Sequence, residues 1–243
     1  MAQVIAQPDI DTLFEAGAHF GRSKSRRHPT AAPYIFGSKD NNDIFDLTQT
    51  ATLLTKALEA VTKIAGEGKQ ILFVGGKAEV ANIVKGAAER VGAPLVAGRW
   101  IGGTLTNFKQ IRRRIDRLNK LTGEKERHEL DKYTKRERLL IDREIEELEH
   151  RFRGLVDMNE RPGMIFVVDT RHEHTAVKEA IQMGIPVIGL ANSDCDMKGI
   201  AYPIPANDSS ARSVAFFVNT IADAYWAYKK AAPAAAPKRG KAE

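Results

Sequence analysis

Two groups of side chains in this sequence are of types that could do chemistry. In the first, Asp169, His172 and His174 follow an apolar run, and Cys195 stands between two aspartates further along. Carboxylate, imidazole and thiolate groups bind zinc or act as general acids and bases. The spacing is not His-Glu-x-x-His, and no second histidine pair follows. We therefore interpret Asp169 or Thr170 as a cap and the histidines as a helix start. We expect no catalytic residue and no cofactor, and a metal at these side chains stays the alternative.

The second group is Gly75-Gly76-Lys77, which lies between an apolar run at residues 71–74 and a helical pattern. Amides at such a helix start can hold a phosphate, and parallel sheets bind ligands beyond the carboxyl ends of their strands. The Walker spacing and the G-x-G-x-x-G pattern are both absent, however, and a tight strand-to-helix turn needs glycine in any case. An enzyme or sensor that binds a nucleotide here is our second hypothesis; the first expects no small-molecule substrate.

Positive charge gathers in two further segments. The first runs from residue 22 to residue 29, between glycine and proline and without an acid, and its basic residues are Arg22, Lys24, Arg26 and Arg27. The second surrounds an apolar stripe, and its basic residues are Lys109, Arg112, Arg113, Arg114, Arg117 and Lys120. A net charge of +6 and a pI near 9.4 favour an anionic partner, either nucleic acid or an anionic membrane. The alternatives are a solvated linker for the first segment and a solvated helix face for the second.

The totals limit the class of protein. A chain of 243 residues allows one large domain, or one domain with an insertion. The single cysteine, Cys195, excludes an intramolecular disulfide and fits a reducing compartment. No apolar run approaches the roughly 20 residues that span a bilayer, and residues 1–7 lack the pattern of a signal peptide. We expect a cytoplasmic protein with no membrane partner.

Short apolar runs alternate with helical patterns through most of the chain. We predict strands buried on both faces at residues 71–74, 95–97, 165–168 and 187–190, and a proline-bounded edge strand at 202–205. We predict helices at residues 48–65, 78–91, 175–183 and 209–229, the last capped by Asp208. This alternation indicates an α/β fold, a parallel Rossmann-like or flavodoxin-like sheet flanked by helices. A short helix after Asp9 and two strands at 34–36 and 44–46 come before it.

Residues 98–153 interrupt the alternation. A glycine-rich turn with Arg99 and Trp100 leads into a helical stripe formed by Leu105, Phe108, Ile111, Ile115, Leu118 and Leu121. A second stripe follows the capping-box pair Thr134 and Glu137 and contains Ile141, Ile145, Leu148, Phe152 and Leu155. The two stripes, joined by polar residues 122–133, predict an antiparallel coiled-coil helical hairpin. Arg99 and Trp100 could brace it, although Trp100 could equally stack on RNA.

These elements define three parts of the chain. We expect a discontinuous sheet domain at residues 1–103 and 156–229, with the hairpin inserted at 104–155. Residues 230–243 hold mainly alanine, proline, lysine and arginine, and predict a disordered basic tail.

An ordered set of motifs resembles one protein family. The motifs are Gly-Ala-His-Phe-Gly at 17–21, Phe-Gly at 36–37, Ile-Leu-Phe-Val-Gly at 71–75, Arg-Trp-Ile-Gly-Gly-Thr-Leu-Thr-Asn at 99–107, Asp169 with His172-Glu173-His174, and Ile204-Pro205 with Asn207-Asp208. Together they resemble the bacterial small-subunit ribosomal protein S-two over residues 9–228. The chain departs from this family at residues 22–29, where basic residues replace an aromatic, and at Gly76-Lys77, where Thr-Lys is common.

The resemblance implies a structural protein that is not an enzyme. It implies a place on the solvent side of the small subunit between head and body, with small-subunit rRNA, neighbouring ribosomal proteins and the large mRNA-binding protein S-one as partners. S-one would be anchored near the mRNA exit. We expect the rRNA-binding residues to be Arg22, Lys24, Arg26, Arg27, Arg99, Trp100, Lys109, Arg112, Arg113 and Arg117. A protein-binding scaffold that contacts no RNA is the third hypothesis.

Overall fold

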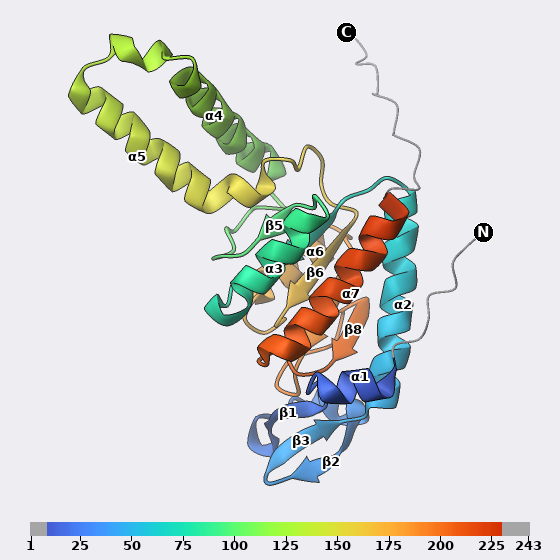
Figure 1. Cartoon of the computed structure of the whole chain (residues 1–243). Coiled ribbons are helices and arrows are strands. Elements are labelled where there is room, and N and C mark those ends of the chain that lie inside the picture. The colour runs from blue at the N-terminus through green and yellow to red at the C-terminus, as the bar shows by residue number, and fades with distance from the viewer. Residues whose placement is uncertain (1–8, 230–243) are drawn as a thin grey trace.

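A five-stranded parallel sheet forms the centre of the molecule (Figure 1). The computed structural model describes residues 9–229. The strands are β4 (Ile71–Val74), β5 (Leu95–Val96), β6 (Met164–Val168), β7 (Val187–Ala191) and β8 (Tyr202–Pro205). They lie in the order β5-β4-β6-β7-β8, and every neighbouring pair is parallel. Numbered along the chain this is 2-1-3-4-5, the flavodoxin-like order. The predicted fold class is confirmed.

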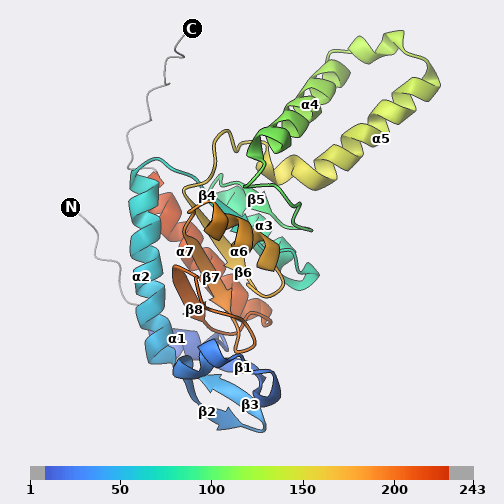
Figure 2. The same ribbon diagram turned by 180° about the vertical axis from the view of Figure 1, so that it is seen from behind.

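Helices cover both faces of the sheet. One face packs against α2 (Leu47–Gly66), α3 (Ala78–Arg90) and α7 (Ala211–Lys229), and the other against α6 (His174–Gln182) and the base of the hairpin (Figures 1 and 2). The strand β4 shows why both faces are buried. Ile71 and Phe73 belong to the first core, whereas Leu72 and Val74 belong to the second. A continuous apolar run therefore fits a central strand, because its side chains alternate between two cores.

A strand forms at residues 95–96, but the expectation that it is buried on both faces was wrong. This strand, β5, is half-buried because it lies at the edge of the sheet. Its apolar character has another cause, because α3 and the turn η4 (Arg153–Leu155) contact it in place of a further strand. Gly154 makes that approach possible, since a Cβ there would collide with the carbonyl oxygen of Leu95. The other predicted edge strand, β8, is at the edge as expected.

The start of α7 differs from the prediction. The side chain of Asn207, not that of Asp208, accepts hydrogen bonds from the backbone N–H groups of Ser209 and Ser210, at 3.0 and 3.3 Å. Asp208 is buried instead and accepts hydrogen bonds from Asn192 Nδ2 and Ser209 Oγ. Asn207 thus caps the turn that leads into α7, which begins at Ala211, and sequence pattern cannot separate two adjacent residues that are both good caps.

A small antiparallel sheet, in the order β1-β3-β2, packs below the main one (Figure 1). Its strands are β1 (Phe20–Ser23), β2 (Ile35–Lys39) and β3 (Asn42–Phe45), and it follows α1 (Ile10–Glu15). Asp40 and Asn41, both with positive φ, turn β2 into β3, which suits a two-residue hairpin loop. The two strands predicted at 34–36 and 44–46 are present with shifted bounds, because β2 and β3 extend through most of the segment 38–43 that we expected as a polar turn. The strand β1 was not predicted, and the basic segment 22–29 contains its end and the short turn η1 (Lys24–Arg26).

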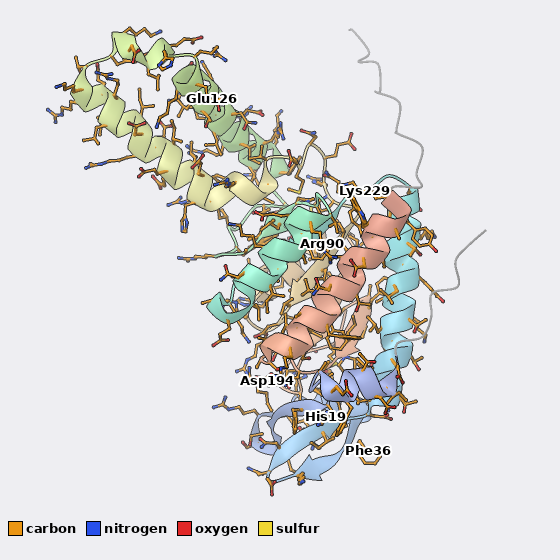
Figure 3. All side chains as sticks on the ribbon, viewed as in Figure 1. His19, Phe36, Arg90, Glu126, Asp194 and Lys229 are labelled. Atoms are coloured by element: carbon orange, nitrogen blue, oxygen red, sulfur yellow. The ribbon has the colours of Figure 1, made fainter. Side chains whose placement is uncertain are left out.

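The predicted helical hairpin is present and extends away from the sheet (Figures 1 and 2). It consists of α4 (Phe108–Glu126), the turn η3 (Glu129–Lys132) and α5 (Lys135–Phe152). Thr134 and Glu137 form the expected capping box. The helix α4 runs on into the segment that we predicted as a link, and Glu126 lies at its far end (Figure 3). The apolar stripes meet in one core that continues through Trp100 and Leu105 to the second face of the sheet.

Two further expectations concern the tail and the membrane. The predicted disordered tail, residues 230–243, lies outside them. Within residues 9–229, no helix has the length and apolar character needed to cross a membrane.

Candidate nucleic-acid interface

A buried polar network joins the carboxyl ends of the sheet strands to the small sheet. Lys77 follows β4, Asp169 follows β6 and Asp208 follows β8. The ammonium group of Lys77 forms an ion pair with Asp169 and lies 3.7 Å from Asp208 Oδ2. The guanidinium of Arg22, from β1, lies 3.6 Å from Asp208 Oδ1. Two cations therefore face two buried carboxylates, and the network is balanced in charge.

The pKa values of the two carboxylates of this network are shifted in opposite directions. Burial alone would raise the pKa of Asp169, but hydrogen bonds from Lys77 and from the backbone N–H groups of His172 and Arg171 outweigh burial and lower it. Burial and the negative charge of Asp169 raise the pKa of Asp208. Burial also lowers the pKa of Lys77, but its two carboxylate neighbours raise it by more, so the ammonium stays charged. The network thus carries its own counter-ion.

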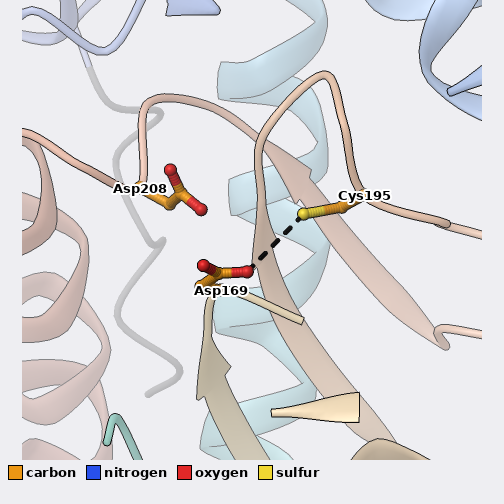
Figure 4. Close-up of side chains that lie close together, drawn as sticks. All are labelled: Asp169, Cys195 and Asp208. Carbon is orange, nitrogen blue, oxygen red and sulfur yellow. Dashed lines mark hydrogen bonds between the residues drawn. The ribbon is translucent and has the colours of Figure 1, made fainter. Parts of the chain in front are cut away.

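Asp169, Cys195 and Asp208 come together as a group that resembles a metal site (Figure 4). One potential ligand atom of each lies within 4.8 Å of the others. Burial and the charge of Asp169 raise the pKa of the Cys195 thiol to about 12, so the thiol stays protonated, and its sulfur lies 3.8 Å from Asp169 Oδ1. The ammonium of Lys77 already supplies the positive charge here. We therefore assign this group to the structure of the domain.

The crevice where a flavodoxin-like sheet would bind a nucleotide is filled by the protein itself. It lies between the ends of β4 and β6, where the strand order reverses. Glu173 Oε1 accepts a hydrogen bond from the Gly76 N–H at 3.1 Å, so a carboxylate takes the place of a phosphate. A Cβ at Gly76 would lie 2.6 Å from both Glu173 Oε1 and the Gly98 carbonyl oxygen. These glycines permit close packing, and the geometry counts against the nucleotide hypothesis.

Asp169, one of the two residues predicted to cap the helix after β6, caps the turn before that helix. Asp169 has a positive φ of 61°, and its Oδ1 accepts hydrogen bonds from the N–H groups of Arg171 and His172 at 3.0 Å each. It caps the turn before α6, while α6 itself begins after Glu173, with His174 as its first residue.

Glu179, on α6, fixes the glycine-rich turn that begins the hairpin. Its carboxylate accepts five hydrogen bonds, from Trp100 Nε1, the backbone N–H groups of Gly103, Leu105 and Thr106, and Thr106 Oγ1. Burial would raise the pKa of Glu179, but these hydrogen bonds lower it overall. The sequence alone gave no signal for this residue, because an acid in the middle of a helix is usually solvated.

Five of the ten predicted rRNA-binding residues are engaged in the fold. Arg27 forms a two-point ion pair with the buried carboxylate of Asp43, and Arg22 belongs to the network around Asp208. Trp100 is only 8% exposed, so of its two predicted roles the structure supports core packing and bracing. The remaining two are on α4 and are described next.

Arg112 and Arg117 both contact groups of the hairpin. Arg112 donates to the carbonyl oxygens of Val156 and Met158, at 3.2 and 3.3 Å, and pairs with Asp116 at 3.0 Å. It therefore ties α4 to the segment that leads back to the sheet. Arg117 bonds the carboxylate of Glu144 on α5 through two nitrogens, at 3.1 and 3.2 Å.

The other five predicted residues are cations that face solvent. Lys24, Arg26, Arg99, Lys109 and Arg113 are all exposed. None of them forms an ion pair with a described residue, and Arg113 makes only a 3.5 Å contact with Gln110 Oε1. Lys109 and Arg113 are four residues apart on α4, so they lie on one face of that helix. Unpaired exposed cations are the groups that can replace counter-ions on a polyanion.

A groove of about 900 Å³ lies where the hairpin meets the edge of the sheet. Its lining includes Arg99 and also Arg153, which is exposed and has no ion-pair partner among the described residues. Sequence reasoning missed Arg153 because it follows the acidic part of α5, and it likewise missed two exposed arginines of that helix, Arg136 and Arg143. A basic residue without an acid three or four positions away was the available signal for Arg136.

The fold and its surface define a structural class of protein: an α/β scaffold with internally balanced titratable groups and a helical arm that presents free cations. The family model of ribosomal protein S2 matches residues 13–227. The chain belongs to the ribosomal protein S2 family, and it is a structural, non-enzymatic constituent of the small ribosomal subunit. It is associated there with rRNA and other ribosomal proteins.

Several relatives are similar over most of the chain. The small ribosomal subunit protein uS2 of Chloroherpeton thalassium is 44% identical over 220 residues, covering 90% of this chain and 88% of the relative. The uS2 protein of Chelativorans sp. is 44% identical over 222 residues, covering 90% and 83%. The protein uS2c of Emiliania huxleyi is 41% identical over 214 residues, covering 88% and 93%.

Proposed function

We propose that this protein contacts small-subunit rRNA directly through its unpaired cations. The contact residues would be Lys24, Arg26, Arg99, Lys109 and Arg113, with Arg153 added from the groove. The observation that carries the proposal is the division among basic residues, since these lack a carboxylate partner among the described residues and face solvent. Lys and Arg bind phosphate by releasing counter-ions, which gives affinity with little reading of sequence. Shape and 2′-hydroxyl contacts would supply the specificity.

The remaining predicted residues serve this function indirectly. Trp100 and Arg112 hold the hairpin at its base, Arg22 ties the small sheet to Asp208 of the main domain, and Arg27 holds the basic segment against Asp43 within the small sheet. A rigid base matters because the cations of Lys109 and Arg113 must keep a fixed position relative to Lys24 and Arg26 if both regions contact one folded RNA. We place this contact on the solvent side of the cytoplasmic ribosome, between head and body.

The experiment is charge reversal with a matched control. The variant Lys109→Glu with Arg113→Glu is compared with Lys56→Glu and Lys63→Glu, two exposed lysines of α2 with the same total change in charge. Each protein is added to small subunits that lack it, and its incorporation is measured across a series of salt concentrations. We expect the hairpin variant to bind more weakly, with a log–log salt slope less negative by about two, one for each lost phosphate contact. Equal binding by both variants would overturn the proposal.

We also propose that the small sheet and α1 help to anchor the large mRNA-binding protein S-one. This end of the molecule holds the exposed apolar side chains Ile10, Phe14, Phe20 and Phe36. Phe36 is 79% exposed and points away from the domain (Figure 3). Phe14 stacks on His19, with ring centroids 4.4 Å apart, and thereby presents a rigid aromatic surface. Exposed apolar groups of this kind mark protein interfaces.

Retention of S-one on purified subunits tests the anchor. Phe14→Ala with Phe36→Ala is expected to lower the amount of S-one that sediments with the subunit. Ile181→Ser, which changes an exposed apolar side chain of α6, is the control and is expected to change nothing. If both variants keep S-one at the wild-type level, the anchor lies elsewhere.

A further inference from the structure

The helix α5 exposes two leucines near the far end of the hairpin. Leu139 and Leu140 are 51% and 56% exposed, and within the described hairpin helices they are the large apolar side chains left facing solvent. The hairpin core is formed by other residues of α5, such as Ile145 and Leu148. Folding of the hairpin therefore does not account for these two leucines.

Two unpaired arginines flank the leucines. Arg136, Leu139, Leu140 and Arg143 stand at positions i, i+3, i+4 and i+7, which places all four on one face of the helix. Both arginines are exposed, and neither forms an ion pair with a residue that the structure describes. Arg138, by contrast, lies 3.5 Å from Asp131, and Arg151 lies 2.7 Å from Glu147. The structure thus leaves two cations available at the two ends of an apolar pair.

We propose that this face, Arg136-Leu139-Leu140-Arg143, docks onto a neighbouring protein whose apolar pocket is bordered by carboxylates. Protein interfaces combine a buried apolar centre with a polar rim, and arginine is enriched in them. A helix that lies in a groove uses side chains at i, i+3, i+4 and i+7 as its anchors. A partner that covers the leucines also removes water from the two arginines, and acidic groups at the border of its pocket then compensate their charge.

RNA fits this face less well. The two arginines alone would suit RNA, because bases stack on guanidinium planes, but the exposed leucine pair at the centre of the face offers neither a stacking plane nor a hydrogen bond to RNA. The leucines therefore favour a protein partner. The proposal is also independent of the rRNA contact proposed above, which rests on Lys109 and Arg113 of the other hairpin helix.

The face is too small to hold a partner by itself. Four side chains are far fewer than the roughly 20–30 residues per partner in a stable interface. Within the assembled subunit, however, a neighbour is held nearby at high effective concentration, and a small contact then suffices. The experiment must therefore use assembled particles.

Photo-cross-linking within purified small subunits tests the proposal. A diazirine residue, which reacts with both protein and RNA, replaces Leu139. A control probe replaces Glu146, which is exposed and lies seven residues, or two turns, further along the same side of α5. We expect the probe at 139 to cross-link to a protein segment that contains Asp or Glu, with a yield several-fold above that of the probe at 146. Reversal of both arginines, Arg136→Glu with Arg143→Glu, should reduce that yield to the control level.

A second variant separates docking from folding. Leu139→Gln with Leu140→Gln keeps good helix formers, so the thermal midpoint of the isolated protein should stay within about 2 °C of wild type. The same variant should lower the retention of the cross-linked neighbour when subunits are washed with salt. Cross-links to rRNA alone, cross-links between two copies, equal yields at both probes, or full retention of the neighbour by the glutamine variant would each overturn the proposal.

Discussion

The carboxyl edge of the sheet and the solvent face of the hairpin both carry lysine and arginine, yet they use them in opposite ways. At the edge, Lys77 and Arg22 neutralise the buried carboxylates Asp169 and Asp208. On the hairpin, Lys109 and Arg113 have no carboxylate partner among the described residues and face solvent. A buried cation must be paired because desolvation of an isolated charge is costly, whereas an exposed cation carries no such requirement. Buried carboxylates thus need cations such as Lys77 and Arg22 as structural partners, and cations with no carboxylate in reach stay available to a polyanion.

The helix α4 also contains both kinds of cation, one bonded within the protein and one free of any carboxylate partner among the described residues. Arg112 and Arg113 are adjacent in sequence, but Arg112 reaches the carbonyl oxygens of Val156 and Met158 and Arg113 does not. Adjacent residues on a helix point about 100° apart, so one can face the domain while the other faces solvent. The charge pattern of the sequence cannot make this distinction, and the following predictions test it.

The largest effect is expected where one carboxylate holds the base of the hairpin. Glu179→Ala removes the acceptor of five hydrogen bonds and should lower the free energy of unfolding by about 4 kcal/mol. Glu179→Gln should also destabilise the protein, because its NH₂ group would face N–H donors. Denaturant unfolding measures both variants. If Glu179→Gln is as stable as wild type, the hydrogen bonds do not hold the turn.

The pH dependence of Glu179 has a definite sign. Its pKa is lowered in the folded protein, so its contribution to stability is present above the unfolded pKa and is lost as pH falls through the folded pKa. The difference between wild type and Glu179→Ala should therefore shrink in acid.

The second-largest loss of stability is expected in the polar network around Asp169 and Asp208. Lys77→Met removes the cation between Asp169 and Asp208 and should cost about 3 kcal/mol at neutral pH, because only Arg22 then remains to neutralise two buried carboxylates. Loss of the cation raises the folded pKa of Asp169, and protonation then relieves the unpaired charge. The destabilisation should consequently decrease as pH is lowered toward about 4. A constant difference from neutral to acid pH, measured by denaturant unfolding, would contradict this account.

A smaller effect is expected from the two adjacent arginines of α4. Arg112→Gln should lower the free energy of unfolding by about 1–2 kcal/mol, since it removes hydrogen bonds to Val156 and Met158. Arg113→Gln should stay within about 0.5 kcal/mol of wild type, as surface changes usually do. Binding to small subunits should show the reverse order, with the larger loss for Arg113→Gln. Similar behaviour of the two variants in both assays would remove the distinction between them.

The smallest effect is expected from the ion pair between Arg117 and Glu144, whose side chains are 45% and 40% exposed. A double-mutant cycle with glutamine at each position should give a coupling energy below about 1 kcal/mol, and salt should reduce it further. The hydrogen bond from Arg117 lowers the pKa of Glu144, so this coupling should be present at neutral pH and lost in acid. A coupling energy of about 3 kcal/mol, equal to the cost expected for Lys77→Met, would show that exposed and buried ion pairs do not differ in this protein.

Much of the fold could be predicted because the relevant signals are local. The continuous apolar runs of β4, β6 and β7 indicated strands covered on both sides, and the Thr134–Glu137 pair marked the start of α5. The misses had non-local causes. The strand β1 depends on pairing with β3, and the half-burial of β5 depends on contact with η4, nearly sixty residues later in the chain. Asp208 was misassigned as a cap because its burial depends on partners in three other segments.

The sequence by itself determined the class of protein: a basic α/β chain with one inserted helical hairpin and an ordered set of family motifs. Periodicity and capping are properties of neighbouring residues, so they can be read directly from the chain. Only the tertiary structure decided which basic residues are free. It paired Arg22, Arg27, Arg112 and Arg117 internally and left Lys24, Arg26, Arg99, Lys109 and Arg113 exposed. The physical reason is that an ion pair requires two groups within about 4 Å, and the folded arrangement of distant segments sets that distance.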